Sequence, residues 1–196
     1  MMILRGSRES TEITRVFGLY DECRLKFGSA DVWHIIAETF EFLPLCAVVG
    51  GQVFCVSGGI GRDLESLDDI GGLDRVQDIP REGPIYDLLY GGPHEGLGWK
   101  YLSRAHPAMF GQDVFDVFNH KNGLQMLIRG NQIVLEGYSH FFNRKGITLC
   151  STPNFRKRVD NLGAFLRVEV DMNHSYHTYS ESSESMKSLP VKYPCF

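Results

Sequence analysis

Two groups of side chains in this sequence have types and spacings that metal or acid–base chemistry uses. His174 and His177 stand three positions apart, a spacing at which two imidazoles can bind one metal ion. No cysteine or acidic residue lies in register with this pair, so we interpret it as part of a solvated segment. A second candidate is a set of closely spaced carboxylates, which comprises Asp63, Glu65, Asp68 and Asp69. A solvated acidic face is our interpretation of this set.

The cysteines show no metal-binding or disulfide pattern. The chain has five of them, and none forms a Cys-x-x-Cys pair: Cys23, Cys46, Cys55, Cys150 and Cys195. An odd number of unclustered thiols is typical of reduced cysteines in a cytosolic or nuclear protein. The sequence therefore argues against a disulfide framework and against a zinc knuckle.

The composition excludes several classes of function. A chain of 196 residues, with 43% hydrophobic and 22% charged residues, suits one soluble globular domain. A net charge of −4 provides no basic surface for nucleic acid. The sequence also lacks the run of about 18 apolar residues that a membrane-spanning helix needs. We therefore expect neither nucleic acid nor a membrane as a partner.

Helices and a hairpin are predicted for the first part of the chain. One helix is indicated by an apolar stripe at helical spacing, formed by Ile13, Val16, Phe17 and Tyr20. Gly28 suits the end of this helix, and Asp31 is a suitable N-cap for a second helix that Pro44 ends. Short apolar runs at 45–49 and 53–56, joined by two glycines, predict a β-hairpin.

The second part of the chain is predicted to be loops followed by strands. Residues 58–111 are rich in Gly, Pro and Asp, which is typical of long loops that carry or cover a site. A short helix is predicted at 113–121. Strands are then expected at 124–129, 132–136, 147–150 and 164–170. From residue 173 the composition becomes small, polar and acidic, so we divide the chain into one domain at 1–172 and a flexible Ser/Glu-rich tail at 173–196.

Several stretches, in chain order, resemble the phosphoprotein (Ser/Thr) phosphatase family, in particular its type 2A branch. Residues 4–10 read Leu-Arg-Gly-Ser-Arg-Glu-Ser where the family has Leu-Arg-Gly-Asn-His-Glu-Ser, and residues 51–59 resemble Gly-Gln-Ile-Phe-Cys-Leu-His-Gly-Gly. Further blocks lie at 16–23, 73–75, 83–89, 110–113, 136–138 and 151–154. The resemblance covers most of residues 3–171. It implies an α/β metallophosphoesterase (calcineurin-like) β-sandwich flanked by helices and lacking its N-terminal strands and helices.

The resemblance also implies chemistry that depends on two divalent metal ions, such as Mn, Fe or Zn. Such a pair clamps the attacking oxygen and the phosphate. The family holds the first metal with Gly-Asp-x-His-Gly and Gly-Asp-x-x-Asp-Arg-Gly, yet this sequence contains no Gly-Asp dipeptide. Both motifs would lie upstream of residue 1. We therefore expect unpaired sheet edges, exposed apolar surface, and a chain that rearranges, relies on a partner or begins further upstream.

The remaining family positions are substituted. The amide ligand aligns with Ser7, the catalytic acid histidine with Arg8, and two further histidine ligands with Ser57 and Asn131. Serine hydroxyls are poor neutral ligands, and a guanidinium carries a fixed positive charge that cannot act as acid or base. The resemblance therefore implies no catalytic residue and no confident metal ligand in this chain, and we predict no cofactor.

The phosphate-binding positions are partly retained. Arg104 aligns with a family arginine that binds phosphate in a bidentate manner, although a solvated or salt-bridged arginine is the alternative interpretation. Phe155 replaces a tyrosine beside the site. Residues 90–93 read Tyr-Gly-Gly-Pro where the family has Trp-Ser-Asp-Pro.

Three functions are compatible with these observations. The first is a catalytically impaired pseudophosphatase that acts by binding, in the cytoplasm or nucleus, to type 2A scaffold or regulatory subunits or to phosphoproteins. The second is an active metal-dependent phosphoserine/phosphothreonine protein phosphatase. The third is a non-functional truncated duplicate or incomplete gene model. We favour the first, because residues 3–171 keep the family pattern while the ligand positions lose the chemistry.

Overall fold

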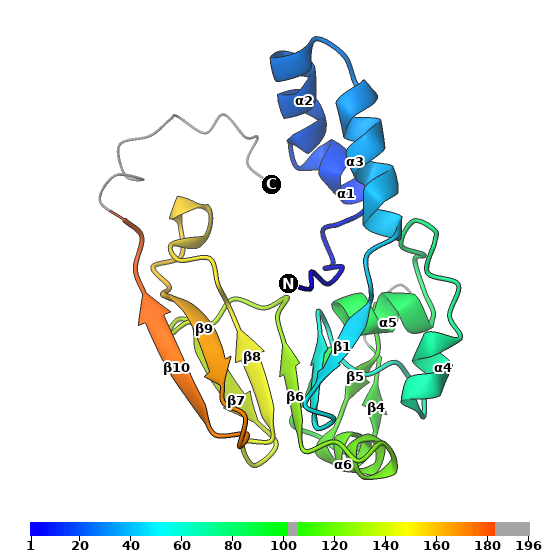
Figure 1. Ribbon diagram of the computed structural model, residues 1–196, viewed down its shortest axis with the longest axis vertical. Coiled ribbons are helices and arrows are strands. Elements are labelled where there is room, and N and C mark those ends of the chain that lie inside the picture. The colour runs from blue at the N-terminus through cyan, green and yellow to red at the C-terminus, as the bar shows by residue number, and fades with distance from the viewer. Residues whose placement is uncertain (102–105, 183–196) are drawn as a thin grey trace.

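A five-stranded mixed sheet organises the computed structural model, which describes residues 1–101 and 106–182 (Figure 1). Its strand order is β1-β2-β6-β8-β7. The strands are β1 (Cys46–Val49), β2 (Val53–Val56), β6 (Met126–Arg129), β7 (Tyr138–Phe141) and β8 (Gly146–Leu149). The three inner strands run parallel to one another, and β1 and β7 close the two edges in the antiparallel direction.

Two smaller sheets accompany this one. Strands β9 (Gly163–Val168) and β10 (His174–Tyr179) form an antiparallel pair that packs beside β7 and β8. Tyr138 stacks on Tyr176 at a centroid distance of 4.1 Å, and the Tyr176 hydroxyl lies 2.8 Å from His140 Nε2. The third sheet is made of β3 (Gly92–Pro93), β5 (Met109–Phe110) and β4 (Trp99–Lys100).

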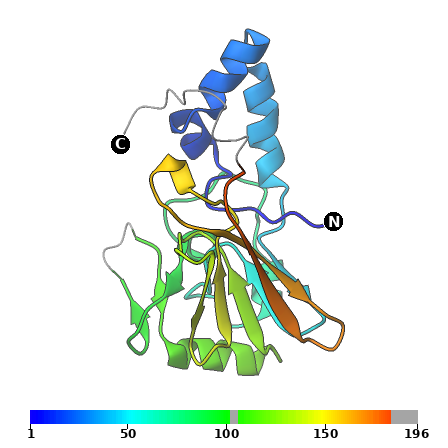
Figure 2. The ribbon, with the colours of Figure 1, turned by 90° about the vertical axis from the view of Figure 1, so that its left-hand side faces the viewer.

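Three N-terminal helices form a lobe beyond one end of the sheets (Figure 1, Figure 2). They are α1 (Thr11–Val16), α2 (Leu19–Phe27) and α3 (Asp31–Glu41). The Ser10 hydroxyl caps α1 by accepting a hydrogen bond from the Ile13 amide at 3.1 Å. The buried Trp33 indole of α3 then donates to Thr14 Oγ1 of α1 at 3.1 Å, which holds the lobe together.

The remaining helices lie against the five-stranded sheet. They are α4 (Leu67–Gly71), α5 (Pro84–Tyr90) and α6 (Gln112–Lys121), with a short 3₁₀ turn η1 (Phe155–Lys157) in the loop before β9. In the described ranges no helix is both long enough and apolar enough to cross a membrane.

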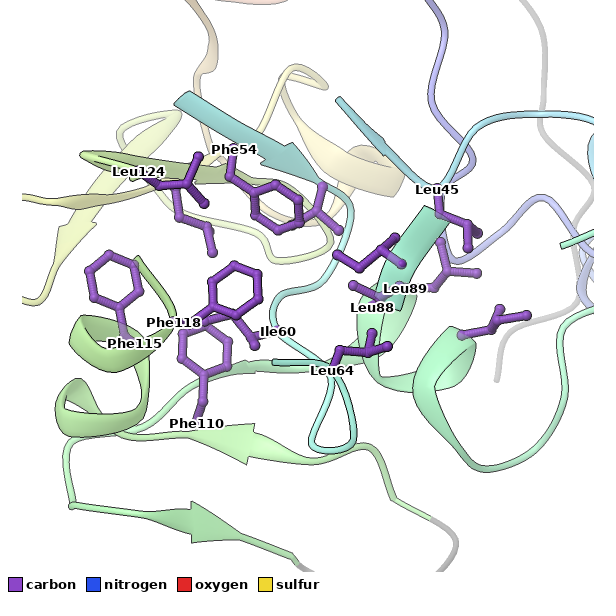
Figure 3. Close-up of a cluster of buried hydrophobic side chains, with 14 residues drawn as sticks. Leu45, Phe54, Ile60, Leu64, Leu88, Leu89, Phe110, Phe115, Phe118 and Leu124 are labelled. Carbon is purple, nitrogen blue, oxygen red and sulfur yellow. The ribbon is translucent and has the colours of Figure 1, made fainter. Parts of the chain in front are cut away.

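The main hydrophobic core lies between the sheet and helices α5 and α6. Figure 3 shows Phe54 of β2 above Phe115 and Phe118 of α6, with Phe110 of β5 beside them. These four side chains are at most 4% exposed. Full burial of one such side chain stabilises the fold by about 1.5–3 kcal/mol, so this aromatic cluster contributes strongly to the position of the loops above it.

Several sequence predictions are confirmed. The hairpin forms as β1 and β2, with its two glycines at φ values of +60° and +71°, which residues with side chains rarely adopt. The predicted helix at 113–121 is α6, and the strands expected at 124–129, 147–150 and 164–170 are β6, β8 and β9 with slightly shifted ends. The alternation of helices and strands agrees with the predicted α/β class.

Other predictions are wrong. The first helix is interrupted at Gly18, whose φ of +100° resets the helical phase, so Val16 and Phe17 are exposed and do not face a core. Asp31 is the first residue of α3 and not its N-cap. Residues 132–136 form no strand, because turns at Asn131 and Gly137 (φ +57° and +81°) enclose them.

The predicted flexible tail is also wrong for its first part. His174–Tyr179 form strand β10, which pairs along its whole length with β9. Polar and small residues favoured a disordered interpretation, but the aromatic residues among them supply the side-chain contacts that a strand needs. Residues 183–196 of the predicted tail lie outside the described residues.

Apolar side chains are exposed at sheet edges, as the sequence led us to expect. Val48 and Val49 of edge strand β1 are 39% and 46% exposed, and Phe165 of β9 is 53% exposed. These positions add to the exposed apolar side chains of the helical lobe, which include Phe27 and Phe42.

The substitution Phe115→Ala tests the role of the aromatic core. We expect it to lower the free energy of unfolding by about 3–5 kcal/mol, because it removes a fully buried ring and leaves a cavity. Val117→Ala, on the exposed face of the same helix, is the matched control and should change stability by less than about 1 kcal/mol. Urea unfolding followed by circular dichroism measures both, and similar losses in the two variants would contradict the assigned core.

Candidate functional site

A buried arginine holds the loop at 4–10 in place. The Arg5 guanidinium is fully buried, and it donates to the Glu9 carbonyl at 3.0 Å and to the Gln77 carbonyl at 2.8 Å. It also lies 3.6 Å from the Asp78 carboxylate. Burial lowers the pKa of Arg5, and the charge of Asp78 acts in the opposite direction. The Arg5 amide also donates to the Pro44 carbonyl, so the backbone just before Ser7 is held in place.

A second buried arginine, Arg129, joins the ends of three elements. Its Nε donates to the Gly58 carbonyl after β2, and its terminal nitrogens donate to the Gly91 carbonyl after α5 at 3.2 Å and to Thr148 Oγ1 of β8 at 3.3 Å. Burial lowers the pKa of this guanidinium to about 10. The loops that follow β2, α5 and β6 are thereby held close together.

The substituted family positions meet at this place. Ser7 Oγ donates to Asn131 Oδ1 at 2.5 Å, and the Tyr90 hydroxyl donates to the Ser7 carbonyl at 2.5 Å. The Ser57 carbonyl accepts from the Gly130 amide at 3.0 Å, next to Asn131. Burial raises the pKa of Tyr90 to about 12, so the phenol stays protonated and acts as a donor. The positions predicted from the sequence are therefore brought together by the fold.

These donors do not fit a pair of divalent cations. Ser7 and Ser57 offer neutral hydroxyls, and the side-chain oxygen of Asn131 already accepts the Ser7 proton. Hard divalent ions require several oxygen or nitrogen ligands, usually including carboxylate or imidazole. Over residues 1–101 and 106–182 there is no group of three or more His, Cys, Asp or Glu side chains that suits a metal ion.

Arg8, which the family resemblance aligns with the catalytic histidine, contacts an aromatic ring. Its guanidinium carbon lies 5.0 Å from the centre of the Phe155 ring. The Arg156 guanidinium lies 5.4 Å from the same ring and 5.1 Å from the ring of Phe17. Sequence reasoning singled out Arg8 and Phe155 but missed Arg156, although a basic run directly after Phe155 was a usable signal.

The other candidates from the sequence have ordinary structural roles or lie elsewhere. His177 stacks on Phe165 at 4.9 Å in strand β10, away from any metal-binding group of the described chain. Asp69 closes a capping box with Ser66 at the start of α4, and hydrogen bonds from Ser66 lower the pKa of Asp69. Glu65 pairs with Lys121 at 2.5 Å. Arg104, predicted to contact phosphate, lies outside the described residues.

The sequence and the fold agree with a known family. The model of the calcineurin-like phosphoesterase family matches residues 1–133, about two-thirds of the chain. The chain belongs to the calcineurin-like phosphoesterase family. The predicted metallophosphoesterase fold is therefore confirmed.

Within the calcineurin-like phosphoesterases, one solved structure is similar to this chain over nearly its whole length. A protein serine/threonine phosphatase from Saccharomyces cerevisiae, described as similar to human phosphatase PP5, aligns with 98% of this chain at 25% sequence identity and a TM-score of 0.85. The alignment covers 62% of the yeast chain, so the chain described here spans less than two-thirds of its length. The architecture is thus that of a Ser/Thr phosphatase.

The substitution Arg129→Met tests whether this buried guanidinium holds the site loops together. Removing the donors leaves buried carbonyls without partners, at about 1–3 kcal/mol each, so we expect a loss of at least about 2 kcal/mol in the free energy of unfolding. Arg167→Met is the control, because Arg167 forms an exposed ion pair with Glu169 on β9. Chemical unfolding curves compare the two, and equal stability of both variants would contradict this role.

Proposed function

We propose that this chain is a Ser/Thr phosphatase-like protein of the type 2A kind that acts by binding and does not hydrolyse phosphate esters. The hydrogen bond between Ser7 and Asn131 supports this proposal more than any other observation. It joins two positions at which the family resemblance implies metal ligands, and it gives each side chain a hydrogen-bond partner within the chain.

The size of the catalytic task supports the same proposal. Enzymes that hydrolyse phosphate monoesters accelerate the reaction by up to about 10²¹-fold. One positioned arginine contributes about 10³–10⁵-fold to phosphoryl transfer. Arginines without a metal pair therefore leave a deficit of many orders of magnitude.

Two kinds of partner suit such a protein. Phosphoproteins are one, because the family's architecture presents its loops to a phosphorylated side chain. The scaffold or regulatory subunits of type 2A phosphatases are the other, because the family pattern extends over most of residues 3–171. We place this activity in the cytoplasm or nucleus, where the unclustered thiols would stay reduced.

A turnover assay tests the proposal. The purified chain is incubated with a phosphoserine peptide in added Mn²⁺, and released phosphate is measured beside an active Ser/Thr phosphatase. We expect a rate at least about 10³-fold below that control, because loss of a single charge-stabilising group alone costs about 10²–10³-fold.

Phosphate release at a rate comparable to that of the control enzyme would overturn the proposal and support an active metal-dependent phosphatase. Co-purification of the untagged chain with a contaminating phosphatase is the main artefact. Phe115→Ala serves as the check on it, because loss of folding should remove a genuine activity and leave a contaminant unchanged.

A further inference from the structure

A cavity of about 790 Å³ lies beside the C-terminal half of α6 and the turn that leads into β6. Its wall includes the apolar side chains of Val117 and Leu124 and the amide side chains of Asn119 and Gln125. Small-molecule sites in proteins have volumes of about 300–1,000 Å³ and combine apolar walls with a few polar groups. The cavity lies at the opposite end of β6 from Asn131, so it is separate from the substituted site (Figure 1).

The side chain of Asn119 is the unusual feature of this cavity. Asn119 is 5% exposed, and neither its Nδ2 nor its Oδ1 has a hydrogen-bond partner among the described residues. In that part of the chain only one other buried side-chain atom, Arg5 Nη2, lacks a hydrogen bond, and it lies 3.6 Å from Asp78. An unpaired buried donor or acceptor destabilises a fold, so such groups are few in native proteins and need a specific explanation. The adjoining cavity is the place from which a partner can reach both atoms.

The neighbouring Asn122 shows how an asparagine stabilises the same end of α6. Its Oδ1 accepts from the Leu67 amide at 2.8 Å, and its Nδ2 donates to the carbonyls of Glu65 and Phe118 at 3.0 and 2.8 Å. Asn122 thereby joins α6 to the start of α4. Asn119 is more deeply buried, yet within the described chain its amide makes no such bond. A role in stabilising the fold therefore does not account for the Asn119 amide.

The backbone around Asn119 is held firmly in place. The Asn119 carbonyl accepts from the Leu124 amide at 2.8 Å, and the Gln125 amide donates to the Gln52 carbonyl at 2.9 Å. Phe118, the residue before Asn119, is 4% exposed and belongs to the aromatic core. The position of the Asn119 amide in the cavity wall is therefore fixed by the core of the protein.

A ligand reaches this amide by moving a side chain of the wall, because both amide atoms are closed off from solvent. Gln125 in the wall is exposed, and in the described ranges its side chain makes no hydrogen bond or ion pair. Exposed side chains change rotamer in picoseconds to nanoseconds. The wall can therefore open without any change in the backbone.

We propose that this cavity binds a small planar molecule that carries a hydrogen-bond acceptor and a donor side by side on one edge, as a carboxamide, a lactam or a nucleobase does. Asn119 Nδ2 donates to the acceptor, and Asn119 Oδ1 accepts from the donor. Asparagine pairs with the edge of adenine in the same way. Val117 and Leu124 offer apolar surface to the rest of the molecule. The inference is independent of the proposed function, because the cavity shares no residue with the substituted site.

A carboxylate suits the cavity less well than a carboxamide. It carries only acceptors, so it would leave Asn119 Oδ1 unpaired and close to a negative charge. The two lysines of the wall, Lys121 and Lys145, already pair with Glu65 and Asp116 at 2.5 and 3.0 Å. A neutral ligand leaves both ion pairs intact, which favours the uncharged amide edge.

Nuclear magnetic resonance of the ¹⁵N-labelled full chain tests the inference. Nicotinamide, 2-pyridone and adenine represent the three kinds of edge, and nicotinate is the matched control for nicotinamide. We expect nicotinamide to shift the backbone amide signals of Asn119, Leu124 and Gln125, and to bind at least about tenfold more tightly than nicotinate. Asn119→Leu should weaken binding by a similar factor, whereas Arg167→Gln, at an exposed arginine of β9, should leave it unchanged.

Thermal unfolding of the same variants separates a binding role from a structural one. Because the Asn119 amide has no partner in the described chain, we expect Asn119→Leu to melt at the temperature of the wild type or above it. Asn122→Leu, which loses three hydrogen bonds, should melt at a lower temperature. Asn119→Ala replaces Asn119→Leu if the larger side chain prevents folding.

Three outcomes would overturn the inference. One is that nicotinamide, 2-pyridone and adenine all leave the signals of Asn119, Leu124 and Gln125 unchanged. Another is equal affinity for nicotinamide and nicotinate, or undiminished nicotinamide binding by the Asn119 variant. The third is a larger loss of melting temperature in the Asn119 variant than in Asn122→Leu, which would give the Asn119 amide a structural role. None of these results depends on whether the chain hydrolyses phosphate.

Discussion

The hydrogen bond between Ser7 Oγ and Asn131 Oδ1 is the contact on which the proposed function rests. It joins the loop before α1 to the turn after β6, two segments that are more than a hundred residues apart in sequence. The family resemblance implies that both side chains stand at metal-ligand positions. Because the two neutral side chains satisfy each other, this contact holds the two loops together.

Buried arginines make this convergence possible. Arg5 anchors the first loop through carbonyls and Asp78, and Arg129 gathers the ends of β2, α5 and β6 through carbonyls and a hydroxyl. Burial lowers the pKa of both guanidiniums, and hydrogen bonds compensate part of the cost of burying them. The chain thus keeps the fold of a phosphoesterase. Arg8, which the family resemblance aligns with the catalytic acid histidine, carries a fixed positive charge and cannot act as an acid.

The sequence predicted local elements better than long-range contacts. The hairpin of β1 and β2 was predictable because two glycines between apolar runs specify a turn locally. Residues 132–136 misled the prediction because Ile133 and Leu135 alternate like a strand but remain exposed in a turn-bounded loop. The meeting of Ser7, Ser57 and Asn131 followed from the family resemblance. The contacts of Arg8 and Arg156 with the Phe155 ring depend on side-chain directions across the fold. The basic run after Phe155 marks Arg156 in the sequence but does not specify which ring it contacts.

Metal content tests the central claim most directly. Crystals of the protein soaked in Mn²⁺ or Zn²⁺ are measured at the absorption edge of each metal, so that an anomalous signal locates any bound ion. We predict no ordered ion among Ser7, Ser57 and Asn131, with the hydrogen bond between Ser7 and Asn131 intact. A fully occupied metal ion coordinated by these side chains would contradict the account.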